Sequence, residues 1–268
     1  MNTLKEILSD HIKYRGQILR LAKSDIIKTY RGAALGWAWA IIKPAVTIFV
    51  FWFAFSVGVR KGAPVDGYPF LLWLIAGYIP WFYMRDCLSV GSSSIRKYKY
   101  LVKRIKYPVD TIPTFMSLSH LIVNLGLQLI MIIMYIAMGF PPTIYYLQLP
   151  ILIFAMFLFF TAWNLFASML SAISNDFLNF VKAMTPALFW LSGIIYNANK
   201  IDIVWIRKIL LFNPVTLIAD GYRNTLVYQQ WIWDVPNEMR NFIIVTVIMI
   251  LLAIWAYHKL KKEIPDVL

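Results

Sequence analysis

The residues with the clearest chemical potential lie in Ser92–Pro108, a segment between two long apolar stretches. It contains no acid, and its basic residues are Arg96, Lys97, Lys99, Lys103, Arg104 and Lys106. Ile95, Tyr98, Val102 and Ile105 recur at spacings of 3, 4 and 3, which predicts one apolar helical face. The segment is therefore predicted to be a short amphipathic helix that ends before Pro108. It is either a docking element for a soluble partner or a basic loop that only follows the positive-inside rule.

Catalytic and nucleotide-binding patterns are missing from the sequence. Cys87 is the only cysteine, and no Gly-Lys pair occurs, which excludes a Walker A phosphate-binding loop. Asp176 is the only acid between residues 111 and 201, so paired carboxylate chemistry is not expected there. We therefore predict no catalytic site, no metal site and no cofactor on this chain. Any process on this chain that consumes energy would have to be driven by a partner or an ion gradient, and the scarcity of acids favours a partner.

The composition is that of a membrane protein. Of the 268 residues 60% are hydrophobic, whereas soluble domains average about 45–50%. Only 15% are charged, yet the formal net charge is +13. In a membrane protein this charge predicts topology and an affinity for anionic lipid headgroups. No pattern of a nucleic-acid-binding fold accompanies it, so no nucleic-acid partner is expected.

Six apolar stretches predict an all-α integral membrane protein with one transmembrane domain, residues 1–268. The stretches are Ala33–Val57, Pro69–Met84 running on toward Val90, Thr111–Met138, Ile144–Ile173, Phe177–Ile195 and Phe242–Tyr257. The sixth is short, and we expect it to borrow residues from Glu238–Asn241 or from the tail.

The N-terminal arm, residues 1–32, is predicted to be an amphipathic helix in the plane of the lipid headgroups. The apolar face is marked by Leu4, Leu8, Ile12, Leu19, Ala22 and Ile26. Gly16 weakens the middle of this helix, and Ser24-Asp25 could start a second one. A helix packed on a neighbouring element is the alternative.

The distribution of basic residues predicts the orientation. Residues 1–31 and 85–108 each hold seven Lys or Arg, and the tail holds Lys259, Lys261 and Lys262. The intervening loops at 60–68 and 139–143 hold two and none. With six spans the basic segments fall on one side, and the positive-inside rule places both termini in the cytoplasm.

The segment 196–240 is predicted to be external and semi-apolar, with two short helices that re-enter the outer leaflet. An ordinary surface loop with interfacial tryptophans is the alternative. Within the first span, Lys43 precedes Pro44. Lys43 either faces the interior and meets an anionic ligand, or the span begins later and leaves it near the interface.

Three segments together resemble ABC-2-type permeases that export polysaccharides. Asp25–Pro44 (DIIKTYRGAALGWAWAIIKP) is similar to the stretch that leads into the first span of that family. Ile95–Pro113 (IRKYKYLVKRIKYPVDTIP) is similar to the loop between its second and third spans. Asn213–Leu226 (NPVTLIADGYRNTL) resembles the external motif before the last span. In that motif the matching residues are Asn213, Pro214, Tyr222 and Arg223.

Within this family the chain most resembles permeases of wall teichoic acid exporters, including its segments Pro64–Phe82 (PVDGYPFLLWLIAGYIPWF) and Tyr145–Leu149 (YYLQL). O-antigen and capsule exporters share the same plan. The resemblance implies a homodimer in a bacterial plasma membrane with two copies of a separate ATPase subunit, which binds ATP and Mg. It implies that residues 92–107 form a coupling helix seated in a cleft of that ATPase. The candidate contacts are Ile95, Arg96, Tyr98, Lys99, Val102 and Lys103.

The implied substrate is a polyprenyl-diphosphate-linked polysaccharide. Candidates for attracting its diphosphate at the cytoplasmic entrance are Arg20, Lys23, Lys28, Arg31 and Lys43, although ordinary lipid anchoring explains the first four equally well. Two other functions stay open on the sequence. One is an ABC-2 permease for a drug or small lipid. The other is a membrane enzyme acting on lipid-linked sugars, which would require an acid or histidine constellation that the sequence does not show.

Overall fold

The protein is helical in the computed structural model, which describes residues 2–32, 34–59, 63–105 and 107–268. Among these residues the only β pairing is a single bridge between Val65 and Tyr68. The predicted all-α class is confirmed. Of the residues used in the charge argument, Lys106, Arg60 and Lys61 lie outside the described part of the chain.

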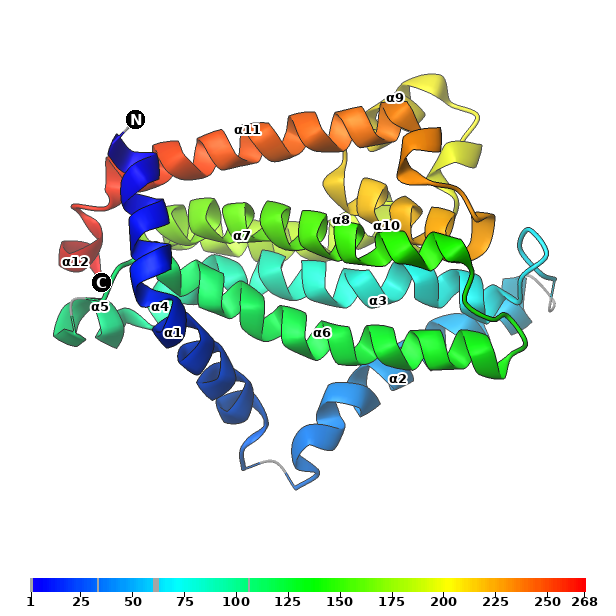
Figure 1. Ribbon diagram of the computed structural model, residues 1–268, viewed down its shortest axis with the longest axis horizontal. Helices are drawn as coiled ribbons and strands as arrows, with labels where there is room; N and C mark the ends of the chain where they lie inside the picture. Colours follow the sequence, from blue (N-terminus) through cyan, green and yellow to red (C-terminus); the bar gives the residue numbers. More distant parts are fainter. Residues whose placement is uncertain (1, 33, 60–62, 106) are drawn as a thin grey trace.

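A bundle of long helices forms the body of the molecule (Figure 1). It consists of α3 (Phe70–Ser89), α6 (Thr111–Ala137), α7 (Leu149–Ile173), α8 (Asn175–Leu191) and α11 (Pro236–Leu260). The central helix is α3, which packs on α6, α7 and α8 and buries most of its length. Its many aromatic residues fill the core, which explains why its sequence is less apolar than that of a lipid-facing helix.

Four helical stretches in the described residues are long and apolar enough to cross a membrane: Gly36–Val59, Thr111–Ala137, Ile144–Ile173 and Pro236–Leu260. The last begins before Glu238–Asn241, so the sixth predicted span does borrow those residues. The other two predicted spans correspond to α3, which ends in a charged turn, and α8, which has 17 residues. The six-span arrangement stays a prediction.

The helix α2 (Trp39–Phe53) lies at the periphery and has no buried residue. A 3₁₀ turn (Gly36–Ala38) precedes it, and a π-helical turn (Ala54–Val59) extends it. In Figure 1 its first turns stand away from the bundle and its last turns approach α3. Phe49, Val50 and Phe53 are more than half exposed, as expected of a helix that faces lipid or another chain.

The N-terminal arm is one helix, α1 (Asn2–Tyr30), without a break at Gly16 or at Asp25. It crosses the end of the bundle that also carries α4 (Ser94–Lys97), α5 (Lys99–Ile105), α12 (Ile264–Val267) and both termini (Figure 1). The structure divides its predicted apolar face between buried and exposed residues, and the placement of this helix in the headgroup plane stays a prediction. Ala22 and Ile26 are buried, but Leu4, Leu8, Ile12 and Leu19 are exposed because the buried face passes through Ile18 and Asp25.

Two short helices, α9 (Val204–Leu210) and α10 (Pro214–Arg223), lie at the opposite end of the bundle (Figure 1). A π-helical turn (Asn224–Tyr228) continues α10. Nine of the ten α10 residues are buried against the bundle. In contrast, α9 exposes Trp205 and Ile209, so only α9 presents an apolar surface outward. The prediction of two short helices in 196–240 is confirmed, whereas their depth in the membrane stays a prediction.

Candidate functional site

The predicted coupling helix is two helices, α4 and α5, interrupted at Tyr98. Ile95, Tyr98 and Val102 are buried against this chain's own α1 and α6 cluster. Ile105, which was predicted to share their face, is 61% exposed because the interruption changes the helical register. The predicted apolar face therefore anchors the segment to the bundle and is not free to contact a partner.

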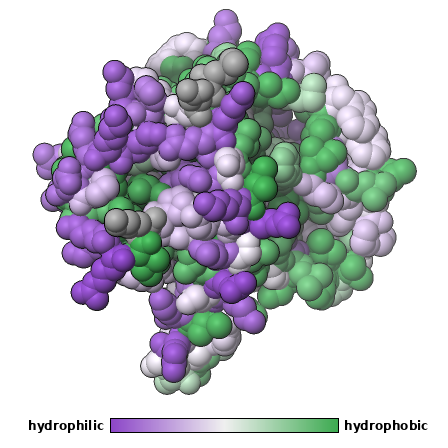
Figure 2. Space-filling model, turned by 60° about the vertical axis from the view of Figure 1, so that its left-hand side comes forward, coloured by the Kyte–Doolittle hydropathy of each residue, from purple (hydrophilic) through white to green (hydrophobic). Residues whose placement is uncertain are grey.

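A set of neighbouring side chains on α5 points outward instead, and we call it the α5 surface. It comprises Lys99, Tyr100, Lys103, Arg104 and Ile105. Figure 2 shows hydrophilic side chains gathered over the end of the molecule that carries α1 and α5. The α5 surface has three positive charges and two exposed hydrophobic groups, which is the chemistry of a surface that binds an acidic protein.

Arg96, the remaining predicted contact of this segment, faces the bundle. Its guanidinium donates to the side-chain oxygen of Asn175 and to the carbonyl of Ala172, the latter at 3.2 Å. Because Ala172 lies in the last turn of α7 and Asn175 starts α8, Arg96 ties α4 to the junction of those two helices.

Asp25 joins three elements at the basic end of the molecule. It is 1% exposed, and one oxygen accepts from Lys97 Nζ of α4 at 2.8 Å and from the Tyr98 hydroxyl. The other oxygen accepts from Ser119 Oγ of α6 at 2.5 Å. Burial raises the pKa of Asp25, but the hydrogen bonds and the charge of Lys97 outweigh burial, so the pKa lies below its usual range.

His11 makes a second junction, between α1 and the start of α6. Its Nε2 lies 2.7 Å from Thr114 Oγ1, and its Nδ1 lies 2.7 Å from the carbonyl of Ile7 and 3.4 Å from the buried carboxylate of Asp110. Burial lowers the pKa of His11. The hydrogen bonds to Asp110 and Ile7 and the charges of Asp110 and Asp10 outweigh it, so the pKa is raised.

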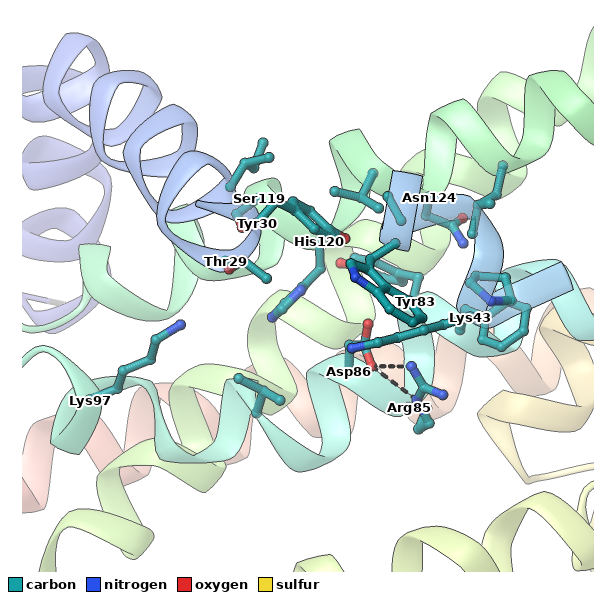
Figure 3. A pocket seen from close by; sticks show the side chains of 18 residues that line it. Thr29, Tyr30, Lys43, Tyr83, Arg85, Asp86, Lys97, Ser119, His120 and Asn124 are labelled. Carbon is teal, nitrogen blue, oxygen red and sulfur yellow. Dashed lines mark hydrogen bonds and ion pairs between the residues drawn. The ribbon is translucent and has the colours of Figure 1, made fainter. Parts of the chain in front are cut away.

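A cavity of 580 Å³, which we call the chamber, opens between α1, α2, α3, α4 and α6 (Figure 3). Its polar and aromatic lining includes Thr29, Tyr30, Trp39, Lys43, Tyr83, Arg85, Asp86, Lys97, Ser119, His120 and Asn124. The cations come from three helices, since Lys43 is on α2, Arg85 on α3 and Lys97 on α4. Its volume is within the range of about 300–1,000 Å³ typical of small-molecule sites.

Two of the three chamber cations are already paired. Arg85 donates to Asp86 through Nε at 2.9 Å and through Nη2 at 2.7 Å, and Lys97 pairs with Asp25. Lys43 has no ion pair among the described residues, and its Nζ lies 5.6 Å from the ring centre of Trp39. His120 Nε2 is buried with no hydrogen-bond partner in the same part of the chain. The chamber is thus a polar space with an uncompensated cation, which favours an anion.

The structure separates the five residues predicted to attract a diphosphate. Lys43 lines the chamber. Whether it meets an anionic ligand there or lies near the membrane interface stays a prediction. Arg20, Lys23, Lys28 and Arg31 are exposed on or just after α1 and do not line it. Lys28 instead lies about 6 Å from the rings of Tyr98 and Tyr100. The sequence reasoning missed Arg85 and His120, although a charged Arg85-Asp86 pair at the end of an apolar stretch was a signal for Arg85.

The four external-motif residues act as a scaffold at the α10 end. Asn213 caps α10 by accepting from the Val215 amide at 3.0 Å, and Pro214 occupies its first turn. Tyr222 and Arg223 are fully buried. The Arg223 guanidinium lies 3.6 Å over the Trp73 ring, donates to the carbonyls of Gly193 and Ile194, and pairs with Asp220 at 3.4 Å. These contacts lock α10 to α3 and to the end of α8.

A family model for ABC-2 type transporters matches residues 16–227. This chain belongs to the ABC-2 type transporter family. The match includes the chamber, the Asp25 junction, the α5 surface and the buried Arg223, and it ends before α11. This ABC-2 transporter chain is therefore a membrane-integral protein, in agreement with its long apolar helices.

Curated relatives align with this ABC-2 chain over almost its full length. One is the O-antigen export system permease protein RfbA of Myxococcus xanthus, 22% identical over 256 residues, which covers 95% of this chain and 96% of the relative. Another is the RfbA permease of Klebsiella pneumoniae, 20% identical over 260 residues, which covers 92% of this chain and 93% of the relative.

Proposed function

We propose that this chain is the transmembrane subunit of an ATP-driven ABC exporter of a polyprenyl-diphosphate-linked polysaccharide in a bacterial plasma membrane. Membership of the ABC-2 family and the export systems named in its relatives support this proposal. The sequence has no Gly-Lys pair and so no Walker A loop, and we therefore propose that a separate ATPase subunit binds ATP and Mg.

The observation that carries the proposal is the α5 surface, which is exposed on a segment whose apolar side chains are buried in the bundle. Its charged side chains point out of the bundle, while Ile95, Tyr98 and Val102 on the same segment are held by the core. A segment held in this way transmits a displacement of the ATPase to the helix bundle, because Asp25 links the segment to α1 and α6. The ATPase would therefore dock through acidic groups that meet Lys99, Lys103 and Arg104.

The proposed arrangement has six spans, with both termini and the α5 surface in the cytoplasm. Both termini lie at the end that carries α1 and α5, as an even number of spans requires (Figure 1). The basic residues of α1, of α4 and α5 and of the tail gather at that same end, in agreement with the positive-inside rule. In this arrangement α3 and α8 also cross the membrane, and α9 and α10 lie at its outer side.

A homodimer is proposed from the polar side chains that α8 leaves exposed. Asn175, Asn179 and Lys182 recur at helical spacing and are exposed in the monomer. A lysine in a membrane helix is unfavourable against lipid, so such a stripe faces protein or water. A second copy packed beside it would enclose a wet path between the two chains, with one ATPase bound to each copy.

Two polymer classes are compatible with the proposal. The relatives are named for O-antigen export, whereas the sequence segments described above resemble wall teichoic acid exporters most. We propose that both polymers are carried on polyprenyl diphosphate and that the chamber binds this shared anionic group.

Reconstitution tests the proposal. The chain and an ATPase subunit encoded beside it are placed together in proteoliposomes loaded with one lipid-linked polymer at a time. We expect ATP-dependent movement of the polymer across the bilayer only when both subunits are present. Movement without the ATPase subunit, or chemical change of the polymer by this chain alone, would contradict the proposal. Comparison of an O-antigen with a teichoic acid polymer decides between the two substrates.

A further inference from the structure

A second cavity adjoins the chamber. It is a groove of 290 Å³ between α2, α3 and α6, and every residue that lines it is apolar. The lining includes Ala45, Ile48, Trp52, Leu71, Ile75 and Ile130. Pro44 and Leu127 line both cavities, so the groove continues from the chamber along α2 toward the other end of the bundle.

The polarity changes abruptly where the two cavities meet. Lys43 lines the chamber, and the next residue, Pro44, is the wall shared with the groove. On the opposite side Asn124 lines the chamber and donates to the carbonyl of Ile79, which lines the groove, at 2.7 Å. Lys43, which has no ion pair among the described residues, therefore lies at the junction of the polar chamber and the apolar groove.

This combination matches an amphiphile with an anionic head. Lys43 can contact the head group directly, because it has no ion pair among the described residues. Arg85 and Lys97 reach the same chamber from two other helices, although each is also paired with an aspartate. The groove excludes charge because it offers no polar side chain to compensate it. A free anion would use only the chamber, and a neutral lipid would use only the groove.

We infer that the chamber and the groove form one binding site for the lipid carrier, with its diphosphate beside Lys43 and the first isoprene units between α2 and α6. The inference rests on the proposed function and deepens it, since it assigns the carrier to a site inside a single protomer. It also gives α2 a role, because this helix supplies both the cation and one wall of the groove.

Binding of an undecaprenyl diphosphate probe to the purified full-length chain in phosphatidylcholine nanodiscs tests the site. Native mass spectrometry measures Kd for four proteins: wild type, Lys43→Gln, Ala45→Trp and Val46→Trp. Ala45 lines the groove, whereas Val46 is 56% exposed and lines neither cavity, so the two tryptophans add the same bulk on different faces of α2. We expect Kd to rise about tenfold in Lys43→Gln and in Ala45→Trp and to stay unchanged in Val46→Trp.

Two further probes identify the ligand class. Inorganic diphosphate is expected to bind more weakly than the lipid probe and to be insensitive to Ala45→Trp. Undecaprenol, which has no phosphate, is expected to be insensitive to Lys43→Gln. Equal binding of inorganic diphosphate and the lipid probe would show a free-anion site. Displacement of the probe by an equal amount of phosphatidylglycerol would show an ordinary anionic-lipid site, and either result would overturn the inference.

The reconstituted exporter separates failure of this site from failure of the proposed function. If Ala45→Trp and Val46→Trp bind the probe equally while the wild-type complex exports polymer, the composite site is wrong and the function stands. If Ala45→Trp alone loses the probe while the wild-type complex exports no polymer, the site stands and the function is wrong.

Discussion

Lys97 Nζ lies 2.8 Å from Asp25 Oδ1, so the basic helix α4 is paired with a buried carboxylate of the N-terminal helix. The same lysine lines the chamber. Lys97, a residue of α4, thus both contacts α1 through Asp25 and lines the proposed carrier site. An anion bound in the chamber would compete with Asp25 for Lys97, and this offers a physical route by which bound substrate could alter the position of α4.

Removing the charge of Asp25 is predicted to loosen this junction. In Asp25→Asn the Lys97 and Tyr98 donors lose a charged acceptor in a buried place, and we expect a loss of stability of about 1–3 kcal/mol. The melting temperature of the purified chain in detergent measures it. Lys23→Gln, an exposed change on the same helix, serves as the control. Equal melting of Asp25→Asn and wild type would show that the junction contributes nothing.

The docking of α1 is predicted to depend on pH through His11. The folded-state pKa of His11 is raised above its usual value near 6.5, so its stabilising effect is complete below about pH 6.5. The effect is lost as pH rises through the raised value. Asp25 does not contribute in this range, since its pKa is lowered and its effect is lost only in acid.

Melting temperatures between about pH 5.5 and 8.5 measure this dependence. Wild type is expected to lose stability toward the alkaline end, and His11→Gln is expected to show a flatter profile. Parallel profiles for the two proteins would rule out His11 as the group responsible.

Close packing around Arg223 predicts that Gly77 cannot be enlarged. A Cβ at Gly77 would lie 2.7 Å from Arg223 Nη2, whereas one at Gly126 meets nothing within 4 Å. We expect Gly77→Ala to lower stability by about 1–3 kcal/mol, because Arg223 has to leave its position over Trp73. Gly126→Ala, also within a long helix, is the control. The melting temperature checks both, and equal values would argue against Arg223 as the lock of α10.

The polar stripe of α8 predicts water at Lys182 in the assembled exporter. A cysteine at Lys182 is expected to react with a membrane-impermeant maleimide, whereas one at Phe180, which is also exposed but lies on another face, is expected to be protected by lipid. The native Cys87 is buried and provides the unlabelled background. Mass spectrometry of labelled membranes measures the yield at each site. Faster labelling at Phe180 would contradict the proposed path between two copies.

Much of this organisation could be predicted from the sequence because long apolar helices and basic segments leave strong local patterns. The helices, the basic end and two short helices in 196–240 all follow from such patterns. The buried face of α1 was harder to predict from the sequence. Asp25 lies on that face because Lys97, Tyr98 and Ser119, which are distant in the sequence, donate hydrogen bonds to it. The outward orientation of α5 depends on the interruption at Tyr98, which the spacing of apolar residues does not reveal.

The chamber could be predicted only in part. Lys43 was recognisable as a charge inside an apolar stretch. Arg85 and His120 became visible as neighbours only when α3 and α6 were placed side by side. The role of the external motif could not be predicted either, because the sequence gives no sign that Arg223, in a segment predicted to be external, is a fully buried packing element.

Charge reversal on the α5 surface tests whether a separate ATPase drives this chain through that surface. Lys103→Glu combined with Arg104→Glu changes only exposed side chains, and Lys208→Glu on α9 reverses an exposed charge at the opposite end. Co-purification of the ATPase with each tagged variant from membranes is the measurement. We expect at least about a tenfold loss of co-purified ATPase for the double variant and no loss for Lys208→Glu. Undiminished co-purification with the double variant would contradict it.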